Sequence, residues 1–330
     1  MKGYAILILL SLAVVLVTPL SAMPSAKTAD AVAGTTAVAA ESTGATTAPT
    51  TAAKPETGAS FVVKDTATGT THTFSETDFL IAVVSCEMAP SSPVEALKAQ
   101  AVASYTYYCK QRAAAADGVF SNVPETLFTA GTPDGMKQRW GEQYQSWYQT
   151  IADAVKAVKG QRILYNGEPI TACYHAISAG LTDSAADVWG GNYPYLQPVD
   201  SSGDLTADGY ETTVTLDTAA VTAALQSLDK SFTPAGDPAA WFASPATTAS
   251  GMVKTVTVCG KTFSGTRLRT ALSLRSACFT VGFADGRFTF TVHGYGHNIG
   301  MSQTGAKYMA NQGAGYQEIL RHYYPGTTVC

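Results

Sequence analysis

The residue whose type and surroundings most clearly offer chemistry is Glu87. It directly follows the uncharged run from Phe79 to Cys86 and stands shortly before a predicted helix. Since that run offers no charge to pair with the carboxylate, desolvation is expected to raise the pKa of Glu87. A carboxyl that stays protonated near neutral pH can act as a general acid. The alternative interpretation is a solvated carboxylate that leads into a core helix.

The residues that follow predict a helix with a defined start. Ser92 is the expected N-cap residue, Pro93 the first helical residue, and Glu95 the side chain that closes a capping box. Lys98 and Gln100 are expected to flank a buried stripe, because apolar residues recur every three or four positions. The members of the stripe are Val94, Leu97, Ala101, Tyr105 and Tyr108.

The sequence lacks the motifs of other common catalytic chemistries. The nucleophile elbow of serine hydrolases, G-x-S-x-G, is absent, and residues 177–180 come nearest to it. Cys86 is either a thiol nucleophile or a buried structural cysteine. The five histidines form no H-E-x-x-H motif and the chain has no paired C-x-x-C, so we expect neither a metal site nor a cofactor.

The composition is that of a globular protein with a substantial core. With 330 residues, of which 46% are hydrophobic and 14% charged, the chain has room for one large domain or two small ones. The formal net charge is −4, and there is no basic run or arginine-rich stripe. Nucleic acid is therefore not expected as a partner.

The chain divides into three regions. Residues 1–22 contain an apolar run from Gly3 to Ala22, which is typical of a signal peptide or a membrane anchor. The anchor is preferred, because the run is long for a signal-peptide core and its end matches a cleavage site only in part. Residues 23–58 are rich in Thr and Ala and predict a disordered linker. Residues 59–330 are expected to form a single folded domain.

The six cysteines could form up to three disulfides in an exported chain. No pairing can be read from their spacing, which is wide and irregular. Because the domain is large enough for a self-sufficient core, several of them are candidates for plain buried thiols. They are Cys86, Cys109, Cys173, Cys259, Cys278 and Cys330.

Residue patterns along 59–330 predict an α+β fold with strands concentrated in the second half. Short β-type runs at 61–63 and 71–74 indicate a hairpin, and helical spacing appears at 141–159. Strands at 160–165 and 170–175 flank an Asn-Gly turn, so this second hairpin would carry Tyr174 and His175 at its far end. Further along, the patterns predict a strand that passes into a helix at 212–228, strands at 252–258, 279–283 and 288–293, and a short helix at 267–274.

Three ordered blocks of sequence resemble the stage II sporulation protein D and amidase-enhancer family. The first block, beginning at Glu87, follows E-M-x-x-S-x-P-x-E-A-L-K-A-Q-A-V-A-x-x-T-Y. The second spans residues 173–195 and the third residues 293–327. Some relatives hold zinc in an insertion between the first two blocks, but residues 110–172 contain neither His nor Cys.

The resemblance implies a lytic transglycosylase that cleaves the glycan strands of peptidoglycan. Glu87 would be the catalytic residue, which protonates the glycosidic oxygen and then accepts the proton of the muramic acid's own 6-hydroxyl as an anhydro ring closes. This route needs one carboxylate, whereas ordinary glycosidases need two. Asp187 is the nearest candidate for a second one, and its alternative role is to cap the turn before Trp189.

The resemblance also implies which residues bind the substrate. Without the resemblance, His175 and His297 could equally be core residues. The glycines and neutral hydrogen-bonding groups of the third block suit a sugar chain, because its hydroxyls require hydrogen bonds. The expected substrate-binding residues are Lys98, Gln100, Tyr105, Tyr174, His175, Ser178, Trp189, His297, Ser302 and Gln303.

Two departures from the family pattern bear on activity. Tyr105 stands where the family usually has an arginine, and a tyrosine keeps a hydrogen bond but not the charge. Asn298 replaces a glycine, which a loop can accept because Asn tolerates left-handed backbone angles. A non-catalytic, peptidoglycan-binding amidase enhancer therefore remains the alternative function.

The implied location follows from the same resemblance. The protein would be exported and anchored in the cytoplasmic membrane facing the cell wall, or secreted if the segment 1–22 is removed. The linker would let the domain reach into the wall. Its expected partners are peptidoglycan strands, including strands already stripped of stem peptides, and a cell-wall amidase that strips them, in sporulation-associated wall remodelling.

Overall fold

The computed structural model describes residues 60–330. The predicted export segment and linker lie outside these residues. Within them, no helix is both long enough and apolar enough to cross a membrane.

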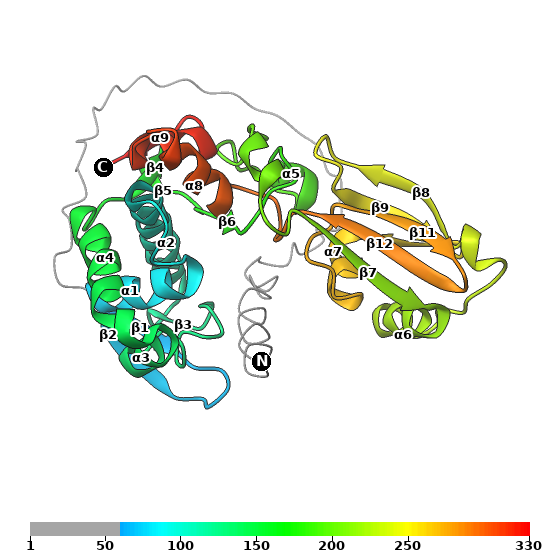
Figure 1. Cartoon of the computed structure of the whole chain (residues 1–330), viewed down its shortest axis with the longest axis horizontal. Coiled ribbons are helices and arrows are strands. Elements are labelled where there is room, and N and C mark those ends of the chain that lie inside the picture. Colours follow the sequence, from blue (N-terminus) through cyan, green and yellow to red (C-terminus); the bar gives the residue numbers. More distant parts are fainter. Residues whose placement is uncertain (1–59) are drawn as a thin grey trace, which may run out of the picture.

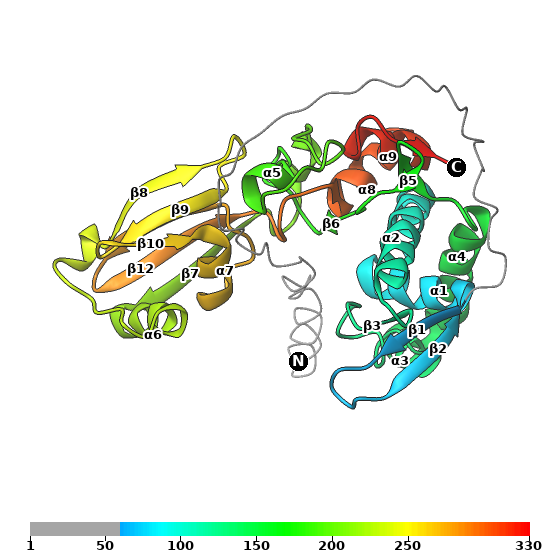
Figure 2. The same cartoon turned by 180° about the vertical axis from the view of Figure 1, so that it is seen from behind.

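Two lobes flank a central segment (Figures 1 and 2). One lobe is mainly helical and contains α1 to α4, and the other consists of β-sheets with two helices. One buried hydrophobic cluster runs through the helical lobe and the central segment, and a second lies within the β-rich lobe. The prediction of an α+β fold with a strand-rich second half is confirmed. That residues 59–330 act as a single domain stays a prediction.

The helical lobe begins with the predicted hairpin. Strand β1 pairs antiparallel with β2 and parallel with β3. Ser75 caps the helix that follows, because its hydroxyl accepts a hydrogen bond from the backbone N–H of Asp78. The elements are β1 (Ser60–Lys64), β2 (Thr71–Ser75), α1 (Glu76–Glu87), α2 (Val94–Ala114), β3 (Val119–Phe120), α3 (Pro133–Trp140), a 3₁₀ turn (Gly141–Gln143) and α4 (Tyr144–Ala157).

The predicted capping box of α2 is wrong. The helix begins at Val94, with Pro93 as a cap residue that makes no side-chain hydrogen bond. Glu95 instead accepts hydrogen bonds from Lys98 and from the backbone N–H of Tyr316, over 2.9 Å for the latter. A contact with another helix thus replaces the local one. Val94, expected in the buried stripe, is 49% exposed.

The central segment links the lobes through short strands. The Asn166–Gly167 turn has positive φ at both residues, as predicted, but the second strand of that hairpin is only Glu168–Pro169. Tyr174 and His175 belong to another strand, β6, which pairs parallel with β13. The elements are β4 (Ile163–Tyr165), β5 (Glu168–Pro169), β6 (Tyr174–His175), α5 (Ala185–Val188), a 3₁₀ turn (Ser202–Thr206), β13 (Met301–Ser302), α8 (Gln303–Asn311), α9 (Tyr316–Tyr323) and β14 (Thr328–Val329).

The β-rich lobe contains two three-stranded antiparallel sheets, ordered β10-β9-β8 and β11-β12-β7. The predicted strands and the predicted strand-to-helix passage at 212–228 are present. The elements are β7 (Glu211–Asp217), α6 (Thr218–Leu228), a 3₁₀ turn (Pro238–Ala240), β8 (Phe242–Thr247), β9 (Val253–Val258), β10 (Lys261–Ser264), α7 (Gly265–Ala271), β11 (Phe279–Ala284) and β12 (Arg287–His293).

All six cysteines have free thiols, so none of the disulfides that the sequence allowed is formed. Cys86, Cys109, Cys173 and Cys278 are buried. These four match the alternative of plain buried thiols.

Candidate active site

Glu87 is the last residue of α1, where the chain turns toward α2. Its neighbours Cys86 and Met88 are buried, and Glu87 is half-buried between them. The amide of Gln303 donates a hydrogen bond to its Oε2 over 3.3 Å. The hydroxyl of Tyr174 faces the same carboxylate as a second donor. Glu87 forms no salt bridge with any other described residue, so only neutral groups hold it.

A series of hydrogen bonds connects these donors behind the carboxylate. The Nε2 of Gln303 also donates to Oε1 of Gln100 over 3.3 Å. The Nε2 of Gln100 donates to Oγ of Ser104 over 3.0 Å, and that hydroxyl donates to the hydroxyl of Tyr174 over 3.5 Å. Gln100 and Ser104 are fully buried. This network fixes the orientation of both groups that contact Glu87.

Burial raises the pKa of Glu87 from its ordinary value of 4.5 to about 7. The hydrogen bonds from Gln303 and Tyr174 favour the carboxylate and oppose part of that shift. A carboxyl with this pKa can both give and take a proton near neutral pH, because neither form is strongly disfavoured. The apolar run before Glu87 is the sequence signal for this environment.

The parallel pair of β6 and β13 brings the second and third blocks to Glu87. Tyr174 lies opposite Met301, and His175 lies opposite Ser302. Gln303 follows as the first residue of α8, and the hydroxyl of Ser302 caps that helix. Ser302 therefore positions the helix that presents Gln303.

His175 and His297 lie side by side, with their ring centroids 5.5 Å apart. The ring of Trp189 lies 5.1 Å from that of His297, so the three predicted residues are brought together. Burial lowers the pKa of His175 to about 4 and holds that of His297 well below its usual value. Both imidazoles are neutral at neutral pH. They can form hydrogen bonds with a ligand, but they are poor proton donors for catalysis.

Ser178 faces a buried carboxylate that the sequence analysis missed. Asp204 accepts hydrogen bonds from the backbone N–H of Ser178 (2.8 Å) and from the hydroxyl of Ser201 (3.1 Å). The hydroxyl of Ser302 is a further partner of Asp204. Asp204 thus supports the loops behind the site. An isolated Asp after Ser and Gly has the pattern of an ordinary surface turn, so the sequence carried no signal for it.

Two predicted binding residues have polar partners other than Glu87. Lys98 pairs with Glu95 over 2.6 Å. The hydroxyl of Tyr105 donates to Oε1 of Glu76 over 3.0 Å. Glu76 begins α1 and Glu87 ends it, which separates the two by about 16 Å at 1.5 Å per helical residue. The hydroxyl of Tyr105 is therefore bound at the opposite end of α1 from Glu87, and the roles of Lys98 and Tyr105 in substrate binding stay predictions.

We expect Tyr105→Phe to affect stability and not function. The substitution removes the hydrogen bond to Glu76 from a side chain that is only 7% exposed, so the free energy of unfolding should fall by about 1 kcal/mol. Urea unfolding measures this change, with the exposed Tyr308→Phe as the matched control. Loss of glycan binding or cleavage in Tyr105→Phe, at unchanged stability, would contradict this placement.

The surroundings of Cys86 and Asp187 bear on the alternative roles that the sequence left open for them. Burial raises the pKa of the Cys86 thiol, which disfavours a nucleophilic thiolate and supports the structural interpretation. Asp187 pairs with Lys254 over 2.9 Å and accepts a hydrogen bond from Ser184, the cap residue of α5. It therefore supports the cap of the short helix that precedes Trp189, and Ser184 is the cap residue. Among residues 60–330, no group of three or more His, Cys, Asp or Glu side chains could hold a metal ion.

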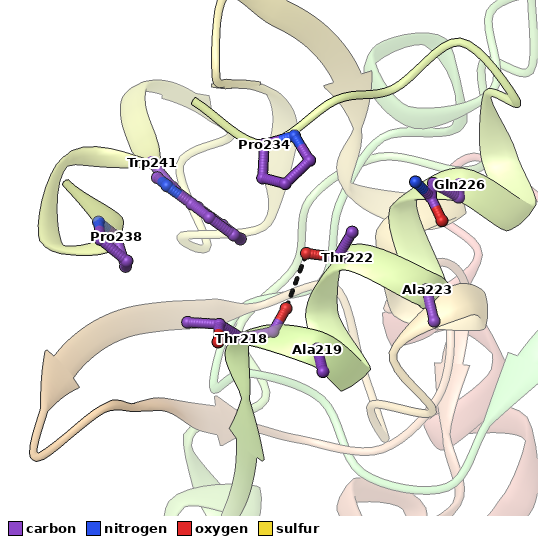
Figure 3. Close-up of a pocket in the computed structure, with 8 residues that line it drawn as sticks. All are labelled: Thr218, Ala219, Thr222, Ala223, Gln226, Pro234, Pro238 and Trp241. Atoms are coloured by element: carbon purple, nitrogen blue, oxygen red, sulfur yellow. Dashed lines mark hydrogen bonds between the residues drawn. The ribbon is translucent and has the colours of Figure 1, made fainter. Parts of the chain in front are cut away.

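A pocket of about 410 Å³ lies elsewhere, in the β-rich lobe, between α6 and the segment 234–241 (Figure 3). Thr218, Thr222, Pro234 and Trp241 are among its lining residues. None of the lining side chains is a carboxyl, imidazole or thiol. General acid catalysis therefore cannot be assigned to this pocket.

Comparisons with known proteins cover most of the described residues. Residues 64–165 match the model of a family described as stage II sporulation protein. The chain is 32% identical over 258 residues to stage II sporulation protein D of Bacillus subtilis (strain 168), which covers 76% of this chain and 73% of that protein. The same protein of Bacillus amyloliquefaciens is 32% identical over 257 residues, with the same coverage.

A second kind of relative is the amidase enhancer of Bacillus subtilis (strain 168). It is 30% identical over 305 residues, which covers 75% of this chain but only 39% of the enhancer. The family-model match includes Glu87 and Gln100 and ends before Tyr174. The contacts of Tyr174, His175 and Gln303 with the first block therefore come from the structure.

Proposed function

The chain belongs to the stage II sporulation protein family, and from this premise we propose that it is a lytic transglycosylase that cleaves peptidoglycan glycan strands. The observation that carries the proposal is the environment of Glu87. Its carboxyl has a pKa of about 7 and contacts only neutral donors. Such a group suits a reaction in which one residue is first an acid and then a base.

The proposed reaction has two proton transfers and consumes no water. Glu87 gives its proton to the glycosidic oxygen as the bond to the anomeric carbon breaks. The 6-hydroxyl oxygen of the same muramic acid then attacks that carbon, and its proton passes to the Glu87 carboxylate. The acid is thereby regenerated, and the product carries a 1,6-anhydro ring.

Gln303 and Tyr174 would act in the second half of the reaction. Both donate toward the carboxylate, so they stabilise the ionised form of Glu87 after it has given up its proton. Asp187 is engaged with Lys254 and with the cap of α5, which leaves it unsuited to activate a water molecule beside Glu87. The single-carboxylate route is therefore favoured over the two-carboxylate chemistry of ordinary glycosidases.

We further propose that the protein is exported through its apolar N-terminal run and acts at the wall during sporulation. The names of the relatives, stage II sporulation protein D and amidase enhancer, support this setting. Under this proposal a cell-wall amidase is the partner that removes stem peptides from the strands. The amidase-enhancer relative also supports a second candidate function, namely a non-catalytic protein that modulates the amidase.

Product analysis distinguishes these functions. The purified chain is incubated with glycan strands, with and without stem peptides, and the products are identified by mass spectrometry. Anhydromuramic ends are the expected result. Reducing ends would instead indicate hydrolysis by water, and intact strands in both samples would favour the amidase modulator.

A further inference from the structure

Asn298 lies at the centre of a buried set of hydrogen bonds, directly after His297 in the chain. Its Oδ1 atom accepts a hydrogen bond from the backbone N–H of Ala179 over 3.0 Å. Its Nδ2 atom lies 2.9 Å from the carbonyl oxygen of Leu181 and 2.7 Å from Oδ2 of Asp183. Asn298 is only 3% exposed. A buried amide with partners on both of its polar atoms is held in one orientation.

The turn between β8 and β9 in the β-rich lobe contributes a further partner, and this turn lies next to α5 (Figures 1 and 2). The hydroxyl of Ser250 in the turn donates to Oδ2 of Asp183 over 2.7 Å, and its oxygen lies 3.1 Å from Nδ2 of Asn298. Asp183 is 2% exposed and forms no salt bridge within residues 60–330. Neutral donors from both sides of the junction therefore satisfy its carboxylate. We call Ser250, Asp183 and Asn298 the junction cluster.

The backbone ties the junction cluster to the loop that carries His297. The N–H of Asp183 donates to the carbonyl of Asn298 over 2.7 Å, and Asp183 also forms a parallel bridge with Ile299. The backbone N–H of Ile299 donates in turn to Nδ1 of His297 over 3.1 Å. The orientation of the His297 ring thus depends on a residue that the junction cluster holds in place.

A second contact from the β-rich lobe reaches the segment that carries Trp189. Lys254 in β9 pairs with Asp187 in α5 over 2.9 Å, and Trp189 is the C-cap residue of that helix. Buried and partly buried apolar side chains pack across the same junction, namely Met252, Ala277, Cys278, Ala179 and Val188. The rings of Trp189 and His297 lie 5.1 Å apart. The β-rich lobe therefore contacts both of the segments that bring these rings together.

We propose that the β-rich lobe supports a ligand-binding wall formed by Trp189 and His297, with Asn298 as the positioning residue of that support. The proposal rests on the proposed function for the identity of the ligand, a glycan strand. Glu87 is held by other donors, which belong to β6 and α8. The junction cluster should therefore govern how tightly the glycan binds, and not the proton transfers of the reaction.

Asn298→Gly tests this role, because glycine adopts the φ of 64° at this position without strain and only the side-chain amide is lost. KM for glycan strands should rise about tenfold, while kcat stays within about twofold of the parent value. The decline of cleavage above a pH of about 7 should be unchanged. A fall in kcat at unchanged KM, or a displaced alkaline limb, would assign the effect to Glu87 and overturn the proposal.

Ser250→Ala is the milder variant, because it removes only the contact from the β-rich lobe. KM should rise about threefold. In the double variant with Asn298→Gly the two effects should not add, since both residues act through one cluster. Ser227→Ala is the matched control and should keep the parent KM, because the hydroxyl of Ser227 donates within α6 to the carbonyl of Ala224. Full additivity of the two effects would contradict a shared cluster.

A spectroscopic readout separates this proposal from the proposed function. The full chain is labelled with 5-fluorotryptophan, and Trp189→Phe identifies the ¹⁹F resonance of Trp189. Ser250→Ala should shift or broaden this resonance, because the ring lies beside that of His297, whereas the resonances of Trp140 and Trp147 in the helical lobe should stay in place. An unchanged Trp189 resonance overturns the supporting role. A changed resonance in a protein whose parent form cleaves no strand would sustain that role and refute the transglycosylase instead.

Discussion

Replacing Glu87 by Gln is expected to reduce cleavage of glycan strands by at least about a hundredfold, the scale for loss of a general acid. The substitution keeps the shape of the side chain and an oxygen that accepts from Gln303, but it removes the proton that the glycosidic oxygen would receive. Release of anhydromuramic ends, followed by mass spectrometry, measures the effect. Glu142→Gln, at an exposed position, is the control and should cleave as the parent does.

The pH dependence of the parent gives an independent readout of the same residue. With a pKa of about 7, Glu87 is protonated below neutrality and ionises above it, so cleavage should decline on the alkaline side of pH 7. Full activity of Glu87→Gln, or a parent profile that stays flat through this range, would mean that another group is the acid.

The Glu87→Gln substitution should raise the stability of the protein while it lowers its activity. The pKa of Glu87 is about 7 in the folded chain and near 4.5 when unfolded. Because the folded pKa is the higher one, the contribution of this carboxyl to stability is fully present below pH 4.5 and is lost as the pH rises to about 7. Gln does not titrate. The free energy of unfolding of Glu87→Gln should therefore increase relative to that of the parent as the pH rises from 4.5 to about 7. Urea unfolding at several pH values measures this difference.

Local patterns were sufficient to predict much of the fold. The passage from β7 to α6, the strands β9, β11 and β12, and the first hairpin all follow from residue periodicity within short windows. The environment of Glu87 was likewise predictable, because the apolar residues before it are its immediate neighbours in α1. These features depend on interactions between residues close in sequence.

Features that depend on distant pairings were not predictable. Strands β6 and β13 contain two residues each, and their parallel pairing joins segments far apart in the chain, so neither has a periodicity to detect. Glu95 had the spacing of a capping box, yet it binds the N-terminus of α9. Tyr105 stands at a position that the family resemblance assigns to the site, yet its hydroxyl donates a hydrogen bond to Glu76. In each case a tertiary contact overrides the local preference.

Gly300→Ala is expected to have the second large effect, because it disturbs the pairing of β6 with β13. Gly300 has φ of 71° and precedes β13, and a Cβ atom there would overlap the carbonyl oxygen of Cys173. That oxygen cannot easily move, because it accepts hydrogen bonds from Met301 (3.1 Å) and from the hydroxyl of Tyr324 (2.7 Å). Left-handed strain and overpacking together should lower the free energy of unfolding by about 3 kcal/mol.

The same substitution should also impair cleavage, because a shift of β13 moves Gln303 relative to Glu87, and a misplacement of about 1 Å can cost about a hundredfold in rate. Gly118→Ala is the matched control. Gly118 has nearly the same φ, 70°, but a Cβ atom there would meet nothing within 4 Å. It should lose only the part due to backbone strain, about 1 kcal/mol, and keep its activity. If urea unfolding shows equal losses for the two variants, the close approach at Gly300 does not hold β6 and β13 together, and the positioning of Gln303 must come from α8 alone.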